Sequence, residues 1–223
     1  MNTFKLEQAV SLHQEGKLEE AEQAYLDILV DEPENGEALK LLGVMACQKN
    51  NTEEGISYLE AAIEADPEIS EYHLVLGRAL FEAGEYNDGI NSVTKSGEID
   101  PGRADVYATL GYFHQHIQNF PVAQRAYERA AVIEPDNVKF RVGAGLSAYF
   151  AGQADTASEY LSAAFEEDGS IHQACYGLAL VKADAGDIGL AEELIAKAIA
   201  LEPENPEYNR LQSQLSESAS DKA

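Results

Sequence analysis

A break in the chain recurs at a fixed interval. Helix-breaking residues stand 34 positions apart along the chain. They are Pro33, Pro67, Pro101, Pro135, Gly169 and Pro203, so five of the six positions hold proline and one holds glycine. Proline cannot continue a helix, and it also disfavours helical backbone at the residue before it. A constant spacing of such breaks indicates a repeated structural unit. We place the units at residues 2–35, 36–69, 70–103, 104–137, 138–171 and 172–205.

A second turn signal divides each unit in two. It consists of Gly16, Asn50, Gly84, Gly152 and Gly186, with Gln118 in the fourth unit. Glycine and asparagine tolerate the left-handed backbone that ends a helix. Between the turn signals, apolar residues recur three and four positions apart, which is typical of an amphipathic helix. Each unit is therefore predicted to be a hairpin of two helices, and the chain to be all-α.

Small residues repeat in the same phase as the turns. Leu42-Gly43, Leu76-Gly77 and Leu110-Gly111 occupy one position of the unit, and an alanine four residues before a bulky residue recurs in the second half. Small side chains allow two helices to cross closely. A single hairpin cannot bury its apolar face alone, so neighbouring hairpins are expected to stack.

These residues resemble the pattern of the tetratricopeptide repeat (TPR) family, W-x2-L-G-x2-Y…A-x3-F…P, over nearly the whole chain. The tryptophan position departs from it, with Lys5, Leu39, His73, Tyr107, Arg141 and Cys175. The resemblance implies a bacterial-type protein of six repeats in one right-handed α-solenoid, the TPR superhelix of stacked antiparallel hairpins, over residues 2–216. We expect a capping helix at 206–216 and a disordered tail at 217–223.

The charge of the chain limits its partners. Fifteen Lys and Arg against 40 Asp and Glu give a formal charge of −25. Such a chain repels phosphate, so neither nucleic acid nor an anionic membrane surface is expected to bind. Cys47 and Cys175 are isolated, the first 25 residues lack the apolar core of a signal peptide, and no apolar run is long enough to cross a membrane. These features favour the cytoplasm.

No arrangement of residues points to catalysis. The G-x-G-x-x-A run that begins at Gly143 lies in phase with the Leu-Gly positions of a helix, whereas a dinucleotide loop must follow a strand. His114 and His116 are two residues apart, so they face different sides of a helix and cannot chelate one metal ion. Acidic runs such as Glu166-Glu167-Asp168 read as solvated surface. We therefore expect no enzyme activity, no metal and no cofactor.

The TPR resemblance also implies a binding surface. In that family the first helix of each hairpin lines the concave face, at positions two, five, nine, twelve and thirteen. The candidate peptide-binding residues at these positions are Lys40, Arg78, Phe81, Tyr112, Tyr149 and Tyr176. The aromatic side chains offer contact area at low entropic cost, although each of them also fits a role in packing between hairpins. The lysines and asparagines of a carboxylate clamp are absent in any recognisable form.

These residues predict a non-catalytic scaffold or adaptor for a protein or peptide that is apolar with some basic character. Two alternatives remain open. One is a regulatory or substrate-recruiting subunit of an enzyme complex, because residues 15–35 and 38–48 resemble TPR arms fused to bacterial glycosyl- and sulfotransferases. The other is a self-assembling structural scaffold, because TPR arrays can associate end to end.

Overall fold

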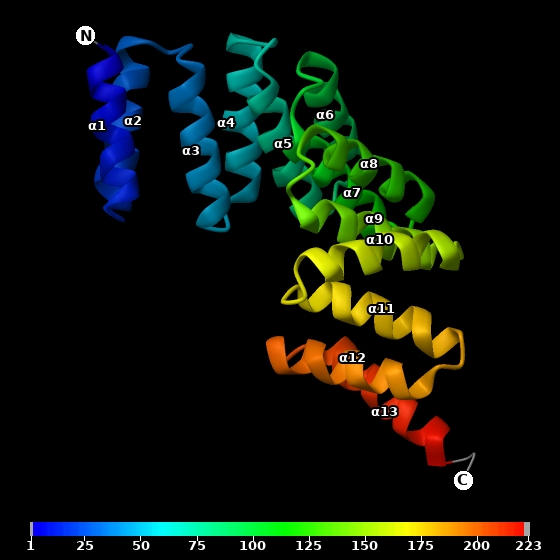
Figure 1. Ribbon diagram of the computed structural model, residues 1–223. Coiled ribbons are helices and arrows are strands. Elements are labelled where there is room, and N and C mark those ends of the chain that lie inside the picture. The colour runs from blue at the N-terminus through cyan, green and yellow to red at the C-terminus, as the bar shows by residue number, and fades with distance from the viewer. Residues whose placement is uncertain (1, 221–223) are drawn as a thin grey trace. The chain divides into compact units, whose positions relative to one another are not determined.

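The computed structural model describes residues 2–220, with side chains from 4 to 217, and all regular structure in this range is helical (Figure 1). The helices are α1 (Asn2–Gln14), α2 (Leu18–Asp31), α3 (Gly36–Gln48), α4 (Thr52–Ala65), α5 (Ser70–Glu82), α6 (Tyr86–Ile99), α7 (Ala104–His116), α8 (Phe120–Ile133), α9 (Val138–Phe150), α10 (Ala154–Glu167), α11 (His172–Asp184), α12 (Ile188–Leu201) and α13 (Pro206–Ser220). The all-α prediction is confirmed. No helix of the described range is long and apolar enough to span a membrane.

Consecutive helices pair into antiparallel hairpins, from α1–α2 to α11–α12, and α13 follows the last pair (Figure 1). The chain divides into two compact units between Gly102 and Arg103. Unit 1 contains α1–α6 and unit 2 contains α7–α13. Within each unit the second helix of one hairpin contacts the first helix of the next, as α4 contacts α5 and α10 contacts α11. The single solenoid over 2–216 stays a prediction.

The turn inside each hairpin has the backbone that the sequence predicted. The residue at this position has a positive φ in every hairpin: Gly16 (76°), Asn50 (64°), Gly84 (88°), Gln118 (59°), Gly152 (78°) and Gly186 (80°). Gln118 adopts this conformation in spite of its side chain. The hairpin geometry therefore prevails over the intrinsic preference of the residue, which for L-amino acids other than glycine opposes left-handed backbone.

Close helix crossings explain the repeated glycines. A Cβ on Gly77 would lie 2.7 Å from the carbonyl oxygen of Gly89, and one on Gly111 would lie 2.7 Å from the Tyr127 ring. The prediction that Gly77 and Gly111 are packing residues is confirmed. The alanines of the second helices serve the same purpose, since Ala21, Ala123 and Ala157 are fully buried.

The last helix covers the end of unit 2 and is longer than predicted. Tyr208, Leu211 and Leu215 of α13 are buried in one cluster with residues of α11 and α12. The helix continues to Ser220, so the expectation of a disordered segment starting at residue 217 is corrected as far as residue 220. Residues 213–220 contain no proline or glycine, so nothing stops the helix from propagating after Leu215. Residues 221–223 of the predicted tail lie outside the described range.

Candidate protein-interaction surface

First helices of neighbouring hairpins contact one another within each unit. In unit 1, α3 contacts α5, and in unit 2, α9 contacts both α7 and α11. The positions predicted to bind a partner lie on these helices, so the register of the repeat sets which side chains share a surface. We call the surface of α7, α9 and α11 the unit 2 face.

The predicted residues of unit 1 differ in their availability. Lys40 is half-buried, and its Nζ donates a hydrogen bond of 2.7 Å to Oε1 of Glu37. Arg78 is exposed. Phe81 is only 5% exposed, its ring centroid lies 4.8 Å from that of Tyr86, and its backbone packs against Gly89. A ring held between α5 and α6 cannot contact a ligand, so Phe81 leaves the candidate set as a core residue.

Two of the predicted tyrosines of unit 2 come together, and the third lies apart from them. Tyr149 on α9 and Tyr176 on α11 both pack at the edge of the same apolar cluster. The Tyr149 hydroxyl donates a 2.8 Å hydrogen bond to Oδ2 of Asp184. Tyr112 on α7 is 56% exposed. The unit 2 face therefore presents one tyrosine to solvent and two that are anchored between helices.

Burial and neighbouring groups keep the anchored phenols neutral. Burial raises the pKa of Tyr149, and the hydrogen bond to Asp184 raises it further. Burial likewise raises the pKa of Tyr176, with Glu207 adding to the shift. At neutral pH these side chains remain hydrogen-bond donors that carry no charge.

A cavity of about 310 Å³ opens on the unit 2 face, a volume at the lower end of those that hold small ligands. Six predicted concave-face positions line it, namely Ala108, Gln115, Lys139, Val142, Leu146 and Gln173. Its walls are mainly apolar. Lys139 is exposed, lines this cavity and has no ion pair among the described residues.

A hydrogen-bond network fixes the floor of the cavity. The Tyr127 hydroxyl donates to Oε1 of Gln115 at 3.1 Å, and Nε2 of Gln115 donates to Oγ of Ser147 at 2.9 Å. Ser147 in turn donates to the carbonyl of Gly143 at 2.7 Å. Burial raises the pKa of Tyr127 well above its ordinary range, so the phenol stays protonated and able to donate.

The floor of this cavity was not predicted from the sequence. Tyr127 belongs to a second helix, α8, and is the bulky residue four positions after Ala123, a pattern that predicts packing, while Phe140 and Gly143 fall outside the concave-face positions. One signal was available, because Gly143 stands two residues before the expected glycine at 145. A Cβ on either Gly111 or Gly143 would lie 2.7 Å from the Tyr127 ring, so the two glycines enclose that ring between α7 and α9.

Neither the two cysteines nor the acidic and histidine side chains of the described range form a reactive thiolate or a metal site. Burial raises the pKa of both Cys47 and Cys175, which disfavours a reactive thiolate at neutral pH. No group of three or more His, Cys, Asp or Glu side chains in this range could hold a metal ion. The run that begins at Gly143 lies inside α9 and follows no strand, so the geometry of a dinucleotide loop is missing there.

The tetratricopeptide repeat model matches residues 6–67, 46–93 and 142–206. These matches cover more than half of the 223 residues, and the helical hairpins agree with them. The chain therefore belongs to the tetratricopeptide repeat family.

Two curated relatives match parts of the chain. Protein O-mannosyl-transferase TMTC1 of Mus musculus is 28% identical over 127 residues, which are 55% of this chain and 13% of the relative. The probable UDP-N-acetylglucosamine–peptide N-acetylglucosaminyltransferase SPINDLY of Hordeum vulgare is 31% identical over 111 residues, which are 47% of this chain and 12% of the relative. The chain thus spans about an eighth of the length of each.

Solved structures share the fold. PilF of Pseudomonas aeruginosa has a TM-score of 0.79 at 15% identity, covering 96% of this chain and 97% of its own. MamA has a TM-score of 0.67 at 24% identity, covering 76% and 92%. YrrB, a TPR protein with an unusual peptide-binding site, has a TM-score of 0.70 at 17% identity, covering 85% and 98%. At these identities the likeness concerns the fold alone.

Proposed function

We propose that the protein is a non-catalytic cytoplasmic scaffold that binds another protein or a peptide on the unit 2 face. The cavity on this face carries the proposal. Its walls are apolar, its floor is fixed by hydrogen bonds, and the exposed Tyr112 ring belongs to the same face. A preformed apolar hollow beside an exposed aromatic side chain is the arrangement that a partner's anchoring residue requires.

A partner segment would place one apolar side chain in the cavity. Leu146 and Val142 would make apolar contacts with this side chain. Gln173 and Lys139 would bind polar groups of the partner, either on its backbone or on its neighbouring side chains. The side chain of Gln115 hydrogen-bonds Tyr127 and Ser147, so it fixes the floor of the cavity and is not available to bind the ligand. We keep Tyr149 and Tyr176 in the proposed site as the flank of the face. Lys40 and Arg78 stay separate candidate binding residues of unit 1.

Affinity capture with matched variants tests the proposal. Ala108→Phe places a ring in the cavity, while Val132→Ala alters a side chain on α8 that is 72% exposed. We expect proteins captured from the native host by the unaltered chain to be retained by the Val132 variant and lost by the Ala108 variant. Equal capture by all three chains, each folded by circular dichroism, would contradict binding at this face.

A second candidate is a substrate-recruiting subunit that acts with a glycosyltransferase in trans. The match to parts of two transferases named for protein glycosylation favours it. Co-purification distinguishes the two, because a stable transferase bound at stoichiometric ratio supports recruitment, whereas a varied set of proteins without a transferase supports the general scaffold.

A further inference from the structure

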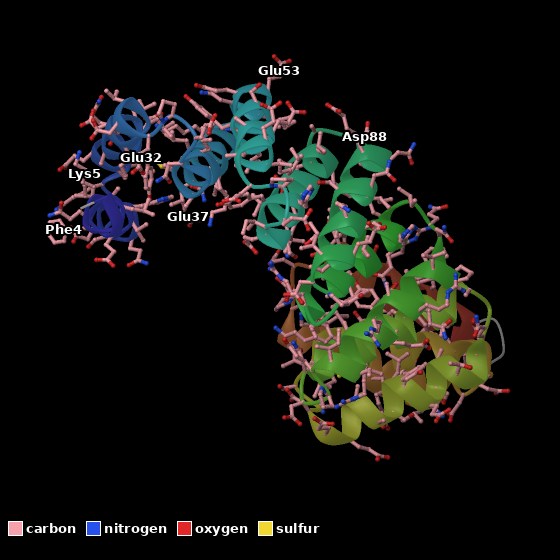
Figure 2. The ribbon with its side chains drawn as sticks, turned by 90° about the horizontal axis from the view of Figure 1, so that it is seen from above. Phe4, Lys5, Glu32, Glu37, Glu53 and Asp88 are labelled. Carbon is pink, nitrogen blue, oxygen red and sulfur yellow. The ribbon has the colours of Figure 1, made fainter. Side chains whose placement is uncertain are left out.

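A second hollow, distinct from the unit 2 face, lies in unit 1 beside the loop that joins α2 to α3. Its volume is about 710 Å³, and its walls include the carboxylates of Glu32, Glu34, Glu37 and Asp66 and the side chain of Tyr72. Glu32 and Glu37 are labelled in Figure 2, where both lie next to α3. We call this hollow the acidic pocket.

Internal contacts neutralise only part of this charge. Nζ of Lys40 lies 2.7 Å from Oε1 of Glu37, and Nδ2 of Asn35 donates to Oε2 of Glu32 at 2.8 Å. Glu34 and Asp66 form no ion pair with any residue of the described range. No lysine or arginine lines the pocket, so its interior keeps an uncompensated negative charge.

Tyr72 provides an observation that is independent of the acidic side chains. Tyr72 is 6% exposed, and its hydroxyl has no hydrogen-bond partner within residues 4–217. Among the side-chain nitrogen and oxygen atoms of that range, only Nδ1 of His114 is both fully enclosed and without a partner. The Tyr72 hydroxyl is therefore not fully enclosed, and it contacts solvent in the acidic pocket, which Tyr72 lines. A buried polar group that lacks a partner is costly unless water or a ligand satisfies it.

A glycine makes room for this hydroxyl. A Cβ on Gly36 would lie 2.9 Å from the Tyr72 hydroxyl oxygen, so any larger residue would displace the phenol. Burial raises the pKa of Tyr72, and Glu37 and then Asp66 raise it further. The phenol is therefore neutral, and it lies in the negative potential of the Glu37 and Asp66 carboxylates.

We propose that the acidic pocket binds the side chain of an arginine in a protein partner. The Tyr72 hydroxyl and the Glu34 and Asp66 carboxylates would accept hydrogen bonds from the guanidinium group. A guanidinium presents five donors in a plane and suits several separated acceptors better than the compact lysine ammonium does. Leu6 and Pro33 in the wall match the apolar stem of the side chain.

The arrangement favours an extended organic cation over a metal ion. No group of three or more acidic, His or Cys side chains within the described residues is placed to hold a metal. The acidic side chains of the pocket therefore do not supply the several converging oxygen ligands that Ca²⁺ requires.

Unit 2 contains a natural counterpart that lacks these features. The hollow of about 620 Å³ at the equivalent loop is lined by Glu134, Asp136 and Asp168, but it has Lys139 at the place of Glu37 and Val138 at the place of Gly36. Ala174 stands 102 residues after Tyr72, so no phenol is present there. This counterpart supplies a control, because Lys139 offsets part of its charge and its hydroxyl acceptor is missing.

The test is a titration of the intact chain, with ¹³C-labelled tyrosine rings, by the peptide acetyl-Gly-Arg-Gly-amide followed by NMR. We expect the Tyr72 ring signals to shift on saturation. Acetyl-Gly-citrulline-Gly-amide, a neutral analogue of similar shape, should bind at least about tenfold more weakly, since a hydrogen bond to a charged group contributes roughly 1.5–3 kcal/mol. Lysine in place of arginine should bind more weakly than arginine, and Ca²⁺ should leave the signals in place.

Variants locate the binding. Tyr72→Phe keeps the ring and removes the hydroxyl acceptor. The affinity for the arginine peptide should then fall about threefold to tenfold, as for the loss of a neutral hydrogen bond. Binding of the peptide to this variant is followed through the backbone amide signal of Gly36. Glu37→Lys introduces the lysine of the unit 2 counterpart and should remove detectable binding, whereas Asp136→Asn in that counterpart should leave the affinity unchanged.

Two results would overturn the inference. Equal binding of the arginine and citrulline peptides would show that charge is not recognised, and equal loss of affinity in the Asp136 and Glu37 variants would show that binding follows net charge and not the pocket. The inference uses the proposed function only in assigning the arginine to a protein partner. Because the probe is a short peptide, failure of the unit 2 face as a docking site would leave this result untouched.

Discussion

At the scale of single residues, some helical glycines lie where two helices cross closely, and others lie where the helix surface is open. A Cβ at Gly111 would meet the Tyr127 ring at 2.7 Å, while one at Gly189 in α12 would meet nothing within 4 Å. Gly111→Ala should therefore lower the free energy of unfolding by roughly 1–3 kcal/mol through overpacking. Gly189→Ala should raise it by up to about 1 kcal/mol, since alanine is the better helix former. Chemical denaturation measures both, and the same sign for the two would contradict the packing role.

Gln118 carries a conformational cost that its five counterparts largely avoid. Its φ is 59°, and the left-handed region is unfavourable for a residue with a Cβ. Gln118→Gly should raise the thermal midpoint, with a gain of roughly 0.5–1 kcal/mol. Gly152→Ala, at the same position of the next hairpin, should lower it by a similar amount. A stabilised Gly152 variant would show that the turn adapts to the side chain.

Single residues also mark the limit of prediction from the sequence. The 34-residue register placed Phe81, Tyr112 and Tyr149 on first helices, yet Phe81 is buried and Tyr112 is exposed. Phe81 packs against Tyr86 at the start of α6, with 4.8 Å between the two ring centroids, and this contact could not be predicted from the period alone. A period fixes the side of the helix from which a side chain projects, but not which neighbouring ring folds over it.

At the scale of elements, α13 docks through a polar contact as well as its apolar side chains. The Tyr208 hydroxyl lies 2.7 Å from Nδ1 of His172 on α11, and the Tyr208 side chain is 2% exposed.

The turn residues and the apolar period predicted the hairpins because both signals are local. The length of α13 was missed because its last turns are polar, so no periodic pattern marks them.

The buried phenols predict a loss of stability at alkaline pH. Burial, with Glu202 and other groups, raises the pKa of Tyr208 from 10.0 to about 12. Between these values the unfolded chain loses the phenolic proton first, so it binds fewer protons than the folded chain and stability falls as pH rises. The loss for one such group is up to roughly 2–3 kcal/mol, and it is absent below pH 10.

Thermal unfolding from pH 9 to 11.5 measures this loss. Tyr208→Phe should reduce the slope of the midpoint against pH, although other tyrosines with raised pKa values will keep it from vanishing. An unchanged slope would mean that Tyr208 ionises as readily in the folded chain as in the unfolded one, and the docking role of its hydroxyl would then fail.

At the scale of the whole molecule, the formal charge of −25 acts on any partner. If the partner is basic, the field of the chain should speed the encounter, and salt should slow it because the Debye length is about 8 Å at physiological ionic strength. Glu71, Glu82 and Asp105 occupy predicted concave-face positions, namely two, thirteen and two of their repeats. Neutralising them should lower the association rate and flatten its salt dependence. Surface plasmon resonance measures both, and an affinity that rises with salt would contradict a basic partner.

Family membership and hairpin arrangement followed from the sequence because each repeat supplies an independent copy of the same signal. The cavity of the unit 2 face did not follow, because it depends on side chains from α7, α8, α9 and α11 that meet only after packing. Tyr127 is the example, since its ring lies between two glycines that are 32 residues apart in the sequence.

The dissociation rate of a captured partner from the unit 2 face tests the central claim most directly. Tyr112→Ala with Ala108→Phe removes the exposed ring and fills the cavity, and Val132→Ala on α8 is the control. Anchoring contacts act mainly on dissociation, so the double variant should raise the dissociation rate at least about tenfold, with little change in its dependence on salt. The control should match the unaltered chain. A dissociation rate unaffected by the double variant, in a chain with an intact helical spectrum, would place the binding surface elsewhere and contradict the account.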